Sequence, residues 1–228
     1  MLNSKPGTVS KFKILLACGA IACPLFVTGF LIQGAIRNDY DPFRHPISSL
    51  SLGERGWIQV AGFIITGLLI LAFATGLART TFFMDSSKKV PWLIGLVGLG
   101  LTGAGIFSTD PVYGYPADAP LIFSQQSMHG YLHEIFSIPV FIGLPLACFI
   151  MRKQFAAVKN YRWAGYAVFT GILMLVTFIL SGIGFKQYAG LENYAGLLQR
   201  ISIITGWTWM TLLALYFLKN ASRAKGNS

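Results

Sequence analysis

Six long runs of apolar residues constrain the fold of this chain more than any other feature. A helix needs about 20 mostly apolar residues to cross the hydrocarbon core of a bilayer. Six segments have that length, and they cover residues 12–36, 57–78, 90–108, 132–151, 163–185 and 197–218. Transmembrane barrels are built from short alternating strands instead. We therefore predict an all-α, polytopic membrane protein with a six-transmembrane-helix bundle.

The composition excludes several other classes of protein. Only 11% of the residues are charged and 54% are apolar, whereas a soluble domain has about a quarter of its residues charged. A soluble globular domain, a disordered chain and a disulfide-rich scaffold are therefore excluded. The first apolar run is too long for a cleaved signal peptide and no A-x-A-like site follows it. The three cysteines lie inside predicted spans, and we interpret them as apolar packing residues.

The charges are divided unevenly between the two ends of the spans. With both termini inside, 13 of the 18 Lys and Arg residues and one acid lie on the inner side. The outer side then holds five basic residues and seven acids. Because short loops rich in Lys and Arg stay cytoplasmic, we predict an N-in/C-in protein of the plasma (bacterial inner) membrane. The net charge of +10 is thus a topology signal, so the expected partners are membrane lipids and not nucleic acid. The oligomeric state is left open.

We predict one domain with two short tails. The cytoplasmic N-terminal tail covers residues 1–11, the six-helix transmembrane domain covers 12–218, and the cytoplasmic C-terminal tail covers 219–228. The first two outer loops are longer than the other connections, at roughly 20 residues each, and loops of that length are often functional. They begin with Asp41-Pro42 and Asp110-Pro111, pairs that fit the start of a short helix. We expect the function to lie on the outer side.

Small residues in the third span predict a central helix. Gly95, Gly98, Thr102 and Gly105 recur every three or four residues and so share one helix face. Small residues allow close approach of helices in lipid, which predicts tight packing along this face. In the fourth span, the prolines at positions 139 and 145 are expected to bend the helix.

All three histidines lie on the predicted outer side: His45, His129 and His133. His129 and His133 are four residues apart, so they share a helix face, and two imidazoles at that spacing suit a zinc ion. A further ligand would come from His45, Asp110 or Asp41. The alternatives are histidines that hydrogen-bond backbone ends or acids at the helix start, and histidines that relay protons or contact a ligand.

Other outer residues are candidates for catalysis or binding. Ser49 lies in a serine cluster after His45-Pro46 and is a candidate nucleophile, although such serines also cap short helices. Glu134 and Asp110 are candidate proton-handling acids. Arg200 stands near the outer start of the sixth span, where it would pair with Asp110 or Glu134, grip an anionic head group, or snorkel to the interface.

Several short motifs stand in a fixed order at the outer ends of the spans. They are Asp41-Pro42 followed by Ile47-Ser48-Ser49-Leu50-Ser51, then Asp110-Pro111, His129-Gly130-Tyr131-Leu132-His133 and Gly196-Leu197-Leu198-Gln199-Arg200. In these motifs the chain resembles bacterial and archaeal six-span membrane proteins of the DUF998 type, which are loosely allied to Frag1/DRAM-like families. The resemblance covers residues 11–218 and implies a fold, but no reaction, substrate or cofactor. More distantly, Ser, Asp and an H-x-x-x-H pair near one membrane face resemble intramembrane metal hydrolases related to alkaline ceramidases, which have seven spans.

Three ligand-related functions remain open from the sequence, beside a purely structural or partner-scaffolding role. The leading hypothesis is an outward-facing polar pocket that binds a lipid head group or a small polar ligand. Its residues would be Asp41, His45, Asp110, His129, His133 and Arg200. The second is a zinc-dependent membrane hydrolase in which His45, His129 and His133 hold the metal. The third is a small proton-coupled transporter, for which the polar residues inside the spans are Gln33, Thr66, Thr102 and Thr177.

Overall fold

A computed structural model describes residues 6–80, 82, 88–117, 119–120 and 125–223 of the chain. Within these residues the regular structure is helical, apart from one isolated bridge between Val112 and Tyr115. Six helical segments are long and apolar enough to cross a membrane. They are α1 (Pro6–Ala35), α2 (Gly56–Ala78), α4 (Lys89–Ile106), the α5–η2–α6 segment (Met128–Ala157), α7 (Tyr161–Phe185) and α8 (Ala195–Arg223). The predicted fold class is confirmed, and residues 1–5 and 224–228 of the predicted tails lie outside the described part.

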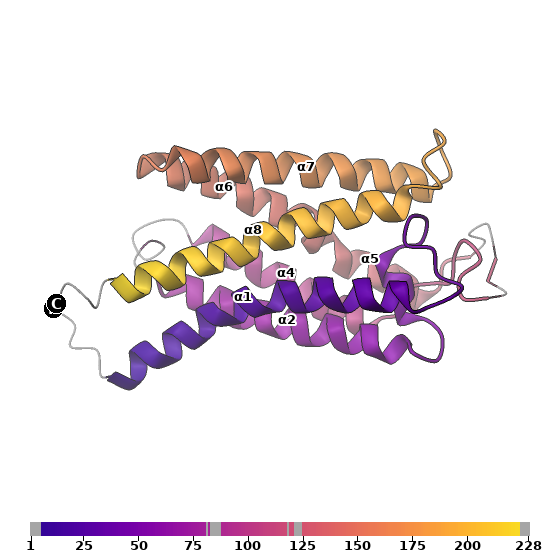
Figure 1. Ribbon diagram of the computed structural model, residues 1–228, viewed down its shortest axis with the longest axis horizontal. Helices are drawn as coiled ribbons and strands as arrows, with labels where there is room; N and C mark the ends of the chain where they lie inside the picture. Colours follow the sequence, from indigo (N-terminus) through magenta and orange to yellow (C-terminus); the bar gives the residue numbers. More distant parts are fainter. Residues whose placement is uncertain (1–5, 81, 83–87, 118, 121–124, 224–228) are drawn as a thin grey trace.

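The spans form one bundle in which α1 begins and α8 ends at the same end (Figure 1). That end is the predicted inner side, and the opposite end, where α1 ends and α8 begins, is called the outer end below. The membrane-length part of α1 among the described residues is Phe12–Ala35. The outer connection after α1 contains a short 3₁₀ helix, η1 (Ile47–Ser51).

Glycines bring α4 into close contact with two neighbouring helices. A Cβ atom added at Gly98 would lie 2.8 Å from the carbonyl oxygen of Gly67 in α2, and one at Gly105 would lie 2.9 Å from Ile64. On another face, Gly103 packs under the ring of Phe136 in α5. The predicted tight packing of the third span is therefore confirmed.

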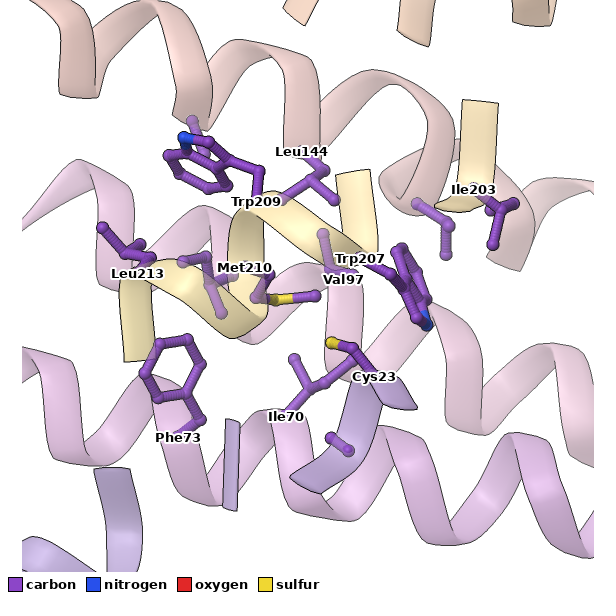
Figure 2. Packing of buried hydrophobic residues seen from close by; sticks show 14 of the residues in the cluster. Cys23, Ile70, Phe73, Val97, Leu144, Ile203, Trp207, Trp209, Met210 and Leu213 are labelled. Carbon is purple, nitrogen blue, oxygen red and sulfur yellow. The ribbon is translucent and has the colours of Figure 1, made fainter. Parts of the chain in front are cut away.

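The core is centred on α8 (Figure 2). Trp207, Trp209, Met210 and Leu213 of α8 lie in one buried cluster with residues of four other helices, which are Cys23 of α1, Ile70 and Phe73 of α2, Val97 of α4 and Leu144 of α6. Cys23 is buried in the same cluster as a free thiol, which fits the predicted packing role.

The fourth span departs from regular α-helix at a proline. Its first part, α5 (Met128–Ile138), continues into a π-helical segment, η2 (Pro139–Gly143), and then into α6 (Leu144–Ala157). Pro139 starts the π-helical segment because its ring lacks the N–H needed for a regular α-helical bond. The irregularity expected at this position is thus present, and short π segments occur frequently at functional sites.

The two Asp-Pro pairs do not begin helices. Asp41-Pro42 leads into a turn, and η1 begins only at Ile47, after Pro46. Asp110-Pro111 leads into the Val112–Tyr115 bridge. The predicted loop helices are wrong at these positions because the aspartates bond to other backbone groups, as described below.

Candidate functional site

The first and second outer loops fold together over the outer end of the bundle. We call residues 36–55 and 107–117 the outer cap. Arg200, 5% exposed, is the main contact between the cap and α8. Its guanidinium donates to the carbonyl oxygens of His45 and Gly196, each at 3.0 Å, and to the hydroxyl of Tyr40. The guanidinium also lies over the Phe30 and Tyr40 rings, 5.9 and 5.4 Å from their centroids.

The start of α8 makes further contacts with the same loop. The Leu197 N–H donates to the Phe43 carbonyl at 3.0 Å, and the Ile47 N–H donates to Oε1 of Gln199 at 2.8 Å. A Cβ added at Gly196 would lie 2.5–2.9 Å from three carbonyl oxygens of the loop. Only glycine allows the loop to approach α8 this closely. The Gly196-Leu197-Leu198-Gln199-Arg200 motif therefore positions the outer cap.

A second arginine closes the cap over α1 and α2. Arg37 donates to the carbonyl oxygens of Leu52 at 3.1 Å and Arg55 at 2.9 Å, and to the Tyr115 hydroxyl at 2.6 Å. It also contacts Oε1 of Gln33 at 3.3 Å. The donors of the guanidinium are thus satisfied by acceptors within the protein.

His45 joins the two outer loops. Its Nδ1 accepts the Asp41 N–H at 2.9 Å, and its Nε2 lies 3.1 Å from the Tyr113 carbonyl oxygen. Because a carbonyl only accepts, Nε2 carries the proton and the ring is neutral. Burial lowers the pKa of His45, and Arg44 and Arg200 act in the same direction, against the Tyr113 carbonyl and the Asp41 carboxylate.

Two tyrosines of the cap are neutral phenols, Tyr40 in a buried position and Tyr113 in a half-buried one. Burial raises the pKa of Tyr40 to about 12 even though Arg200 acts against this shift, and burial raises the pKa of Tyr113 to about 12. The Tyr113 hydroxyl donates to the carbonyl of Phe185, which ties the second outer loop to α7. The cap is therefore connected to several helices.

Acidification is expected to destabilise the outer cap through His45. The folded-state pKa of His45 lies below its unfolded value of about 6.5, so the unfolded chain binds the proton more readily. The stabilisation is complete above pH ~6.5 and decreases as the pH falls toward the folded pKa. Unfolding temperatures measured in detergent between pH 8 and 5 should decrease, and His45→Gln should show a smaller decrease. His129→Gln, at an exposed position, is the control, and an equal pH dependence in wild type and His45→Gln would contradict this assignment.

The predicted acidic ligands bind nearby backbone groups. Oδ1 of Asp41 accepts the Phe43 N–H at 2.9 Å, which forms a turn. Oδ2 of Asp110 accepts the Ser127 N–H at 2.9 Å at the start of α5, where a carboxylate is favoured by the helix dipole. Neither Asp110 nor Glu134 is among the hydrogen-bond partners found for Arg200, so the predicted ion pair is wrong.

The three histidines do not form the predicted zinc site. His45 is held within the outer cap, whereas His129 is exposed beside the Phe107 ring, with a centroid distance of 5.7 Å. His133 is buried between α4 and α5. In the described ranges, no three side chains of His, Cys, Asp or Glu are grouped so as to hold a metal ion.

The other catalytic candidates are also separated. Ser49 is fully buried, and its Oγ has no hydrogen-bond partner among the described residues. A serine nucleophile needs a base within hydrogen-bond distance, so this position lacks the arrangement that the nucleophile hypothesis requires. The Glu134 side chain is exposed at the outer end of α5.

Among the described residues, His133 is the predicted site residue that lines a small cavity inside the bundle. This cavity has a volume of about 40 Å³ and lies beneath η1 in the outer half of the bundle. We call it the α5–α8 cavity. Its polar lining residues are Ser48, His133, Ser137 and Gln199, and its apolar lining residues are Phe26, Ile47, Phe63, Leu101, Ala104, Val140, Phe141 and Ile203.

The tautomer of His133 is set by two backbone carbonyls. Its Nδ1 lies 2.9 Å from the Ala104 oxygen and 2.8 Å from the Phe107 oxygen. Nδ1 must therefore carry the proton, which leaves Nε2 as a hydrogen-bond acceptor in the neutral ring. Ser137 donates to the His133 carbonyl at 2.8 Å. The ring is thus held rigidly at the cavity wall.

Sequence reasoning missed three polar residues of this cavity. Ser48 and Gln199 belong to the short motifs at the outer span ends, and Ser137 lies one turn after His133. The polar residues proposed for a transporter lie elsewhere: Thr102 and Thr177 bond to carbonyls of their own helices, and Gln33 donates to Gln59. A wider groove of about 540 Å³ at the inner end is lined by Asn160, Arg162, Trp163 and Tyr166, and it contains none of the predicted site residues.

Six membrane-length helices, with a cap over one end and a small polar cavity beneath it, define a polytopic α-helical membrane protein. The chain belongs to the DUF998 family of proteins of unknown function, whose family model matches residues 20–216. The matched segment contains the outer cap and the whole lining of the α5–α8 cavity. No curated protein and no solved structure matches the chain. The relation to Frag1/DRAM-like proteins stays a prediction.

Proposed function

We propose that this protein binds a small polar group, such as the head group of a lipid, in the α5–α8 cavity. The observation that carries the proposal is the His133 ring, 5% exposed, which lines the cavity with its Nδ1 proton already used by the bundle. Its Nε2 has no hydrogen-bond partner among the described residues. Nε2 is therefore a free acceptor on a residue of the cavity wall, and a hydrogen-bond donor from a ligand or a water would bind to it.

The surroundings of His133 support a binding site. Binding sites are mostly apolar with a few convergent polar groups, and the α5–α8 cavity has four polar residues among its twelve lining residues. Two of the apolar ones, Val140 and Phe141, come from the π-helical segment, a feature that is frequent at functional sites.

The outer cap has a supporting role in this proposal. Ser48 and Ile47 of η1 form part of the cavity wall, and Gln199 holds Ile47 in place. Arg200 and His45 bind the same loop but do not line the cavity. They position the wall and do not contact the ligand.

Filling the cavity is expected to abolish ligand retention. Ala104 is 3% exposed and lies in the cavity wall, so Ala104→Leu would place three further carbon atoms in a space of about 40 Å³. Native mass spectrometry of the purified protein should detect bound lipid-sized adducts on the wild type and at least about fivefold fewer on Ala104→Leu. His129→Leu, on an exposed position of α5, is the control and should retain them. Equal adducts on wild type and Ala104→Leu would contradict the proposed function.

A further inference from the structure

We infer that the group bound in the α5–α8 cavity is the hydroxyl of an uncharged lipid, which enters sideways from the membrane between the fourth span and α8. This inference rests on the proposed function and specifies the class of ligand. It combines the charge, the hydrogen-bonding pattern, the size and the mouth of the cavity.

The lining favours an uncharged ligand. None of its described residues is Asp, Glu, Lys or Arg. The guanidinium of Arg200, the residue after Gln199, is engaged with the carbonyl oxygens of His45 and Gly196 and is not free to pair with an anion. A phosphate or carboxylate in this apolar space would lack a counter-ion, and burying an unpaired charge is strongly unfavourable.

The hydrogen-bonding pattern is that of an alcohol. Nε2 of His133 is an acceptor and needs a donor from the ligand. Oε1 of Gln199 is occupied by the Ile47 N–H, so the Gln199 side chain offers its amide N–H groups and needs an acceptor. A hydroxyl donates one hydrogen bond and accepts others, and therefore satisfies both residues. An ether or ester oxygen only accepts.

The cavity admits the head of such a molecule and not its chain. A water molecule needs about 10–15 Å³ of such volume, so about 40 Å³ holds roughly three waters, or a hydroxyl with the first carbons that carry it. A drug-sized ligand needs about 300 Å³ or more. The remainder of a larger ligand must therefore lie outside the cavity.

The burial of the lining residues indicates where the chain of the ligand leaves. Phe26, Phe63 and Leu101 are at most 5% exposed and form the closed inner wall. The half-buried lining residues are Ser48 of η1, Ser137 of α5, Phe141 of η2 and Gln199 of α8. We therefore place the mouth between the fourth span and the start of α8, beside η1. The residues beside it include Ile138, which is 56% exposed and faces the surface that lipid chains contact in a membrane span. An apolar chain leaving the mouth would pack on this surface.

The test compares ligands that share an oleyl chain and differ in their polar head group, together with glycerol, which has hydroxyl groups but no chain. The full-length protein is placed in nanodiscs of phosphatidylcholine, which has no hydroxyl group, with about 5 mol% of oleyl alcohol, oleyl methyl ether or oleate, or with glycerol in solution. Oleyl alcohol should raise the unfolding temperature by about 3–6 °C, as expected at roughly tenfold excess over Kd. The ether, oleate and glycerol should each give less than a third of that shift. Ala104→Leu and His133→Phe should abolish the alcohol effect, and His129→Phe should preserve it.

Each other outcome decides against part of the inference. Equal shifts with alcohol and ether would contradict the requirement for a hydroxyl group. A larger shift with oleate would contradict an uncharged ligand, and a shift with glycerol alone would contradict a lipid ligand. If Ala104→Leu loses the bound adducts while oleyl alcohol does not shift the unfolding temperature of the wild type, the inference fails and the proposed function stands. If Ala104→Leu matches the wild type in its adducts and in its response to oleyl alcohol, the proposed function and the inference fail together. Because His133→Phe also removes the bonds to two carbonyls, Ala104→Leu decides the result if His133→Phe does not fold.

Discussion

Arg200→Met is expected to detach the first outer loop from α8 and to destabilise the protein by about 2–6 kcal/mol. The substitution keeps apolar contact with Phe30 but leaves the buried His45 carbonyl and the buried Tyr40 hydroxyl without their charged donor. Each buried group left unsatisfied costs about 1–3 kcal/mol. Thermal unfolding in detergent measures the loss. A cysteine placed at Leu50, a residue that is 0% exposed in η1, should react with a maleimide much faster in the Arg200→Met background.

Two further variants separate geometry from charge. Arg200→Lys keeps the positive charge, but one ammonium group does not match the three acceptors held by the guanidinium, so we expect an intermediate loss. Lys186→Met removes the same charge from an exposed position at the outer end of α7 and should change the stability by less than about 0.5 kcal/mol. Wild-type stability and labelling for Arg200→Met would show that Arg200 does not hold the cap.

Gly67→Ala is expected to separate α2 from α4 and to cost about 1–3 kcal/mol or more. The added Cβ would lie 2.7 Å from the Gly98 oxygen and 2.9 Å from the Thr102 nitrogen, and it would overlap the Thr102 hydroxyl. The first two atoms belong to the backbone of α4, so a side-chain movement does not relieve the contact. Thermal unfolding in detergent, followed by circular dichroism, measures the effect.

The matched control lies in the same helix. No atom lies within 4 Å of a Cβ added at Gly62, so Gly62→Ala should leave the stability unchanged or raise it by about 0.5–1 kcal/mol through better helix propensity. The difference between the two variants therefore isolates the contact with α4. Equal unfolding temperatures would contradict tight packing at Gly67.

The spans were predictable because hydropathy and length alone decide which segments cross a membrane. The predicted span at residues 163–185 matches α7, and the glycines of the third span lie where α4 meets α2. The spacing of small residues carries this information directly, since close approach in lipid requires them.

The contacts of the polar residues were not predictable in the same way. Arg200 and Asp110 have opposite charges at the same end of the bundle, yet each is satisfied by backbone groups close to it in space. The sequence does not show which carbonyls a folded loop presents to a guanidinium. Similarly, His129 and His133 are in one helix, but only His133 turns into the bundle. Its partners are carbonyls of α4 and its C-terminal end, which carry no side-chain signal.

The partners of Arg37 and Arg200 also determine how the outer end responds to its surroundings. The acceptors of the two guanidinium groups are carbonyl oxygens, phenols and one amide oxygen. Carboxylates lose their charge near pH 4, whereas these neutral acceptors keep their lone pairs in acid. The bonds of Arg200 are also buried, so dissolved salt screens them only weakly. A membrane protein built in this way keeps its arginine bonds at salt concentrations and pH values that break ordinary ion pairs, which leaves His45 as the acid-sensitive contact of the outer cap.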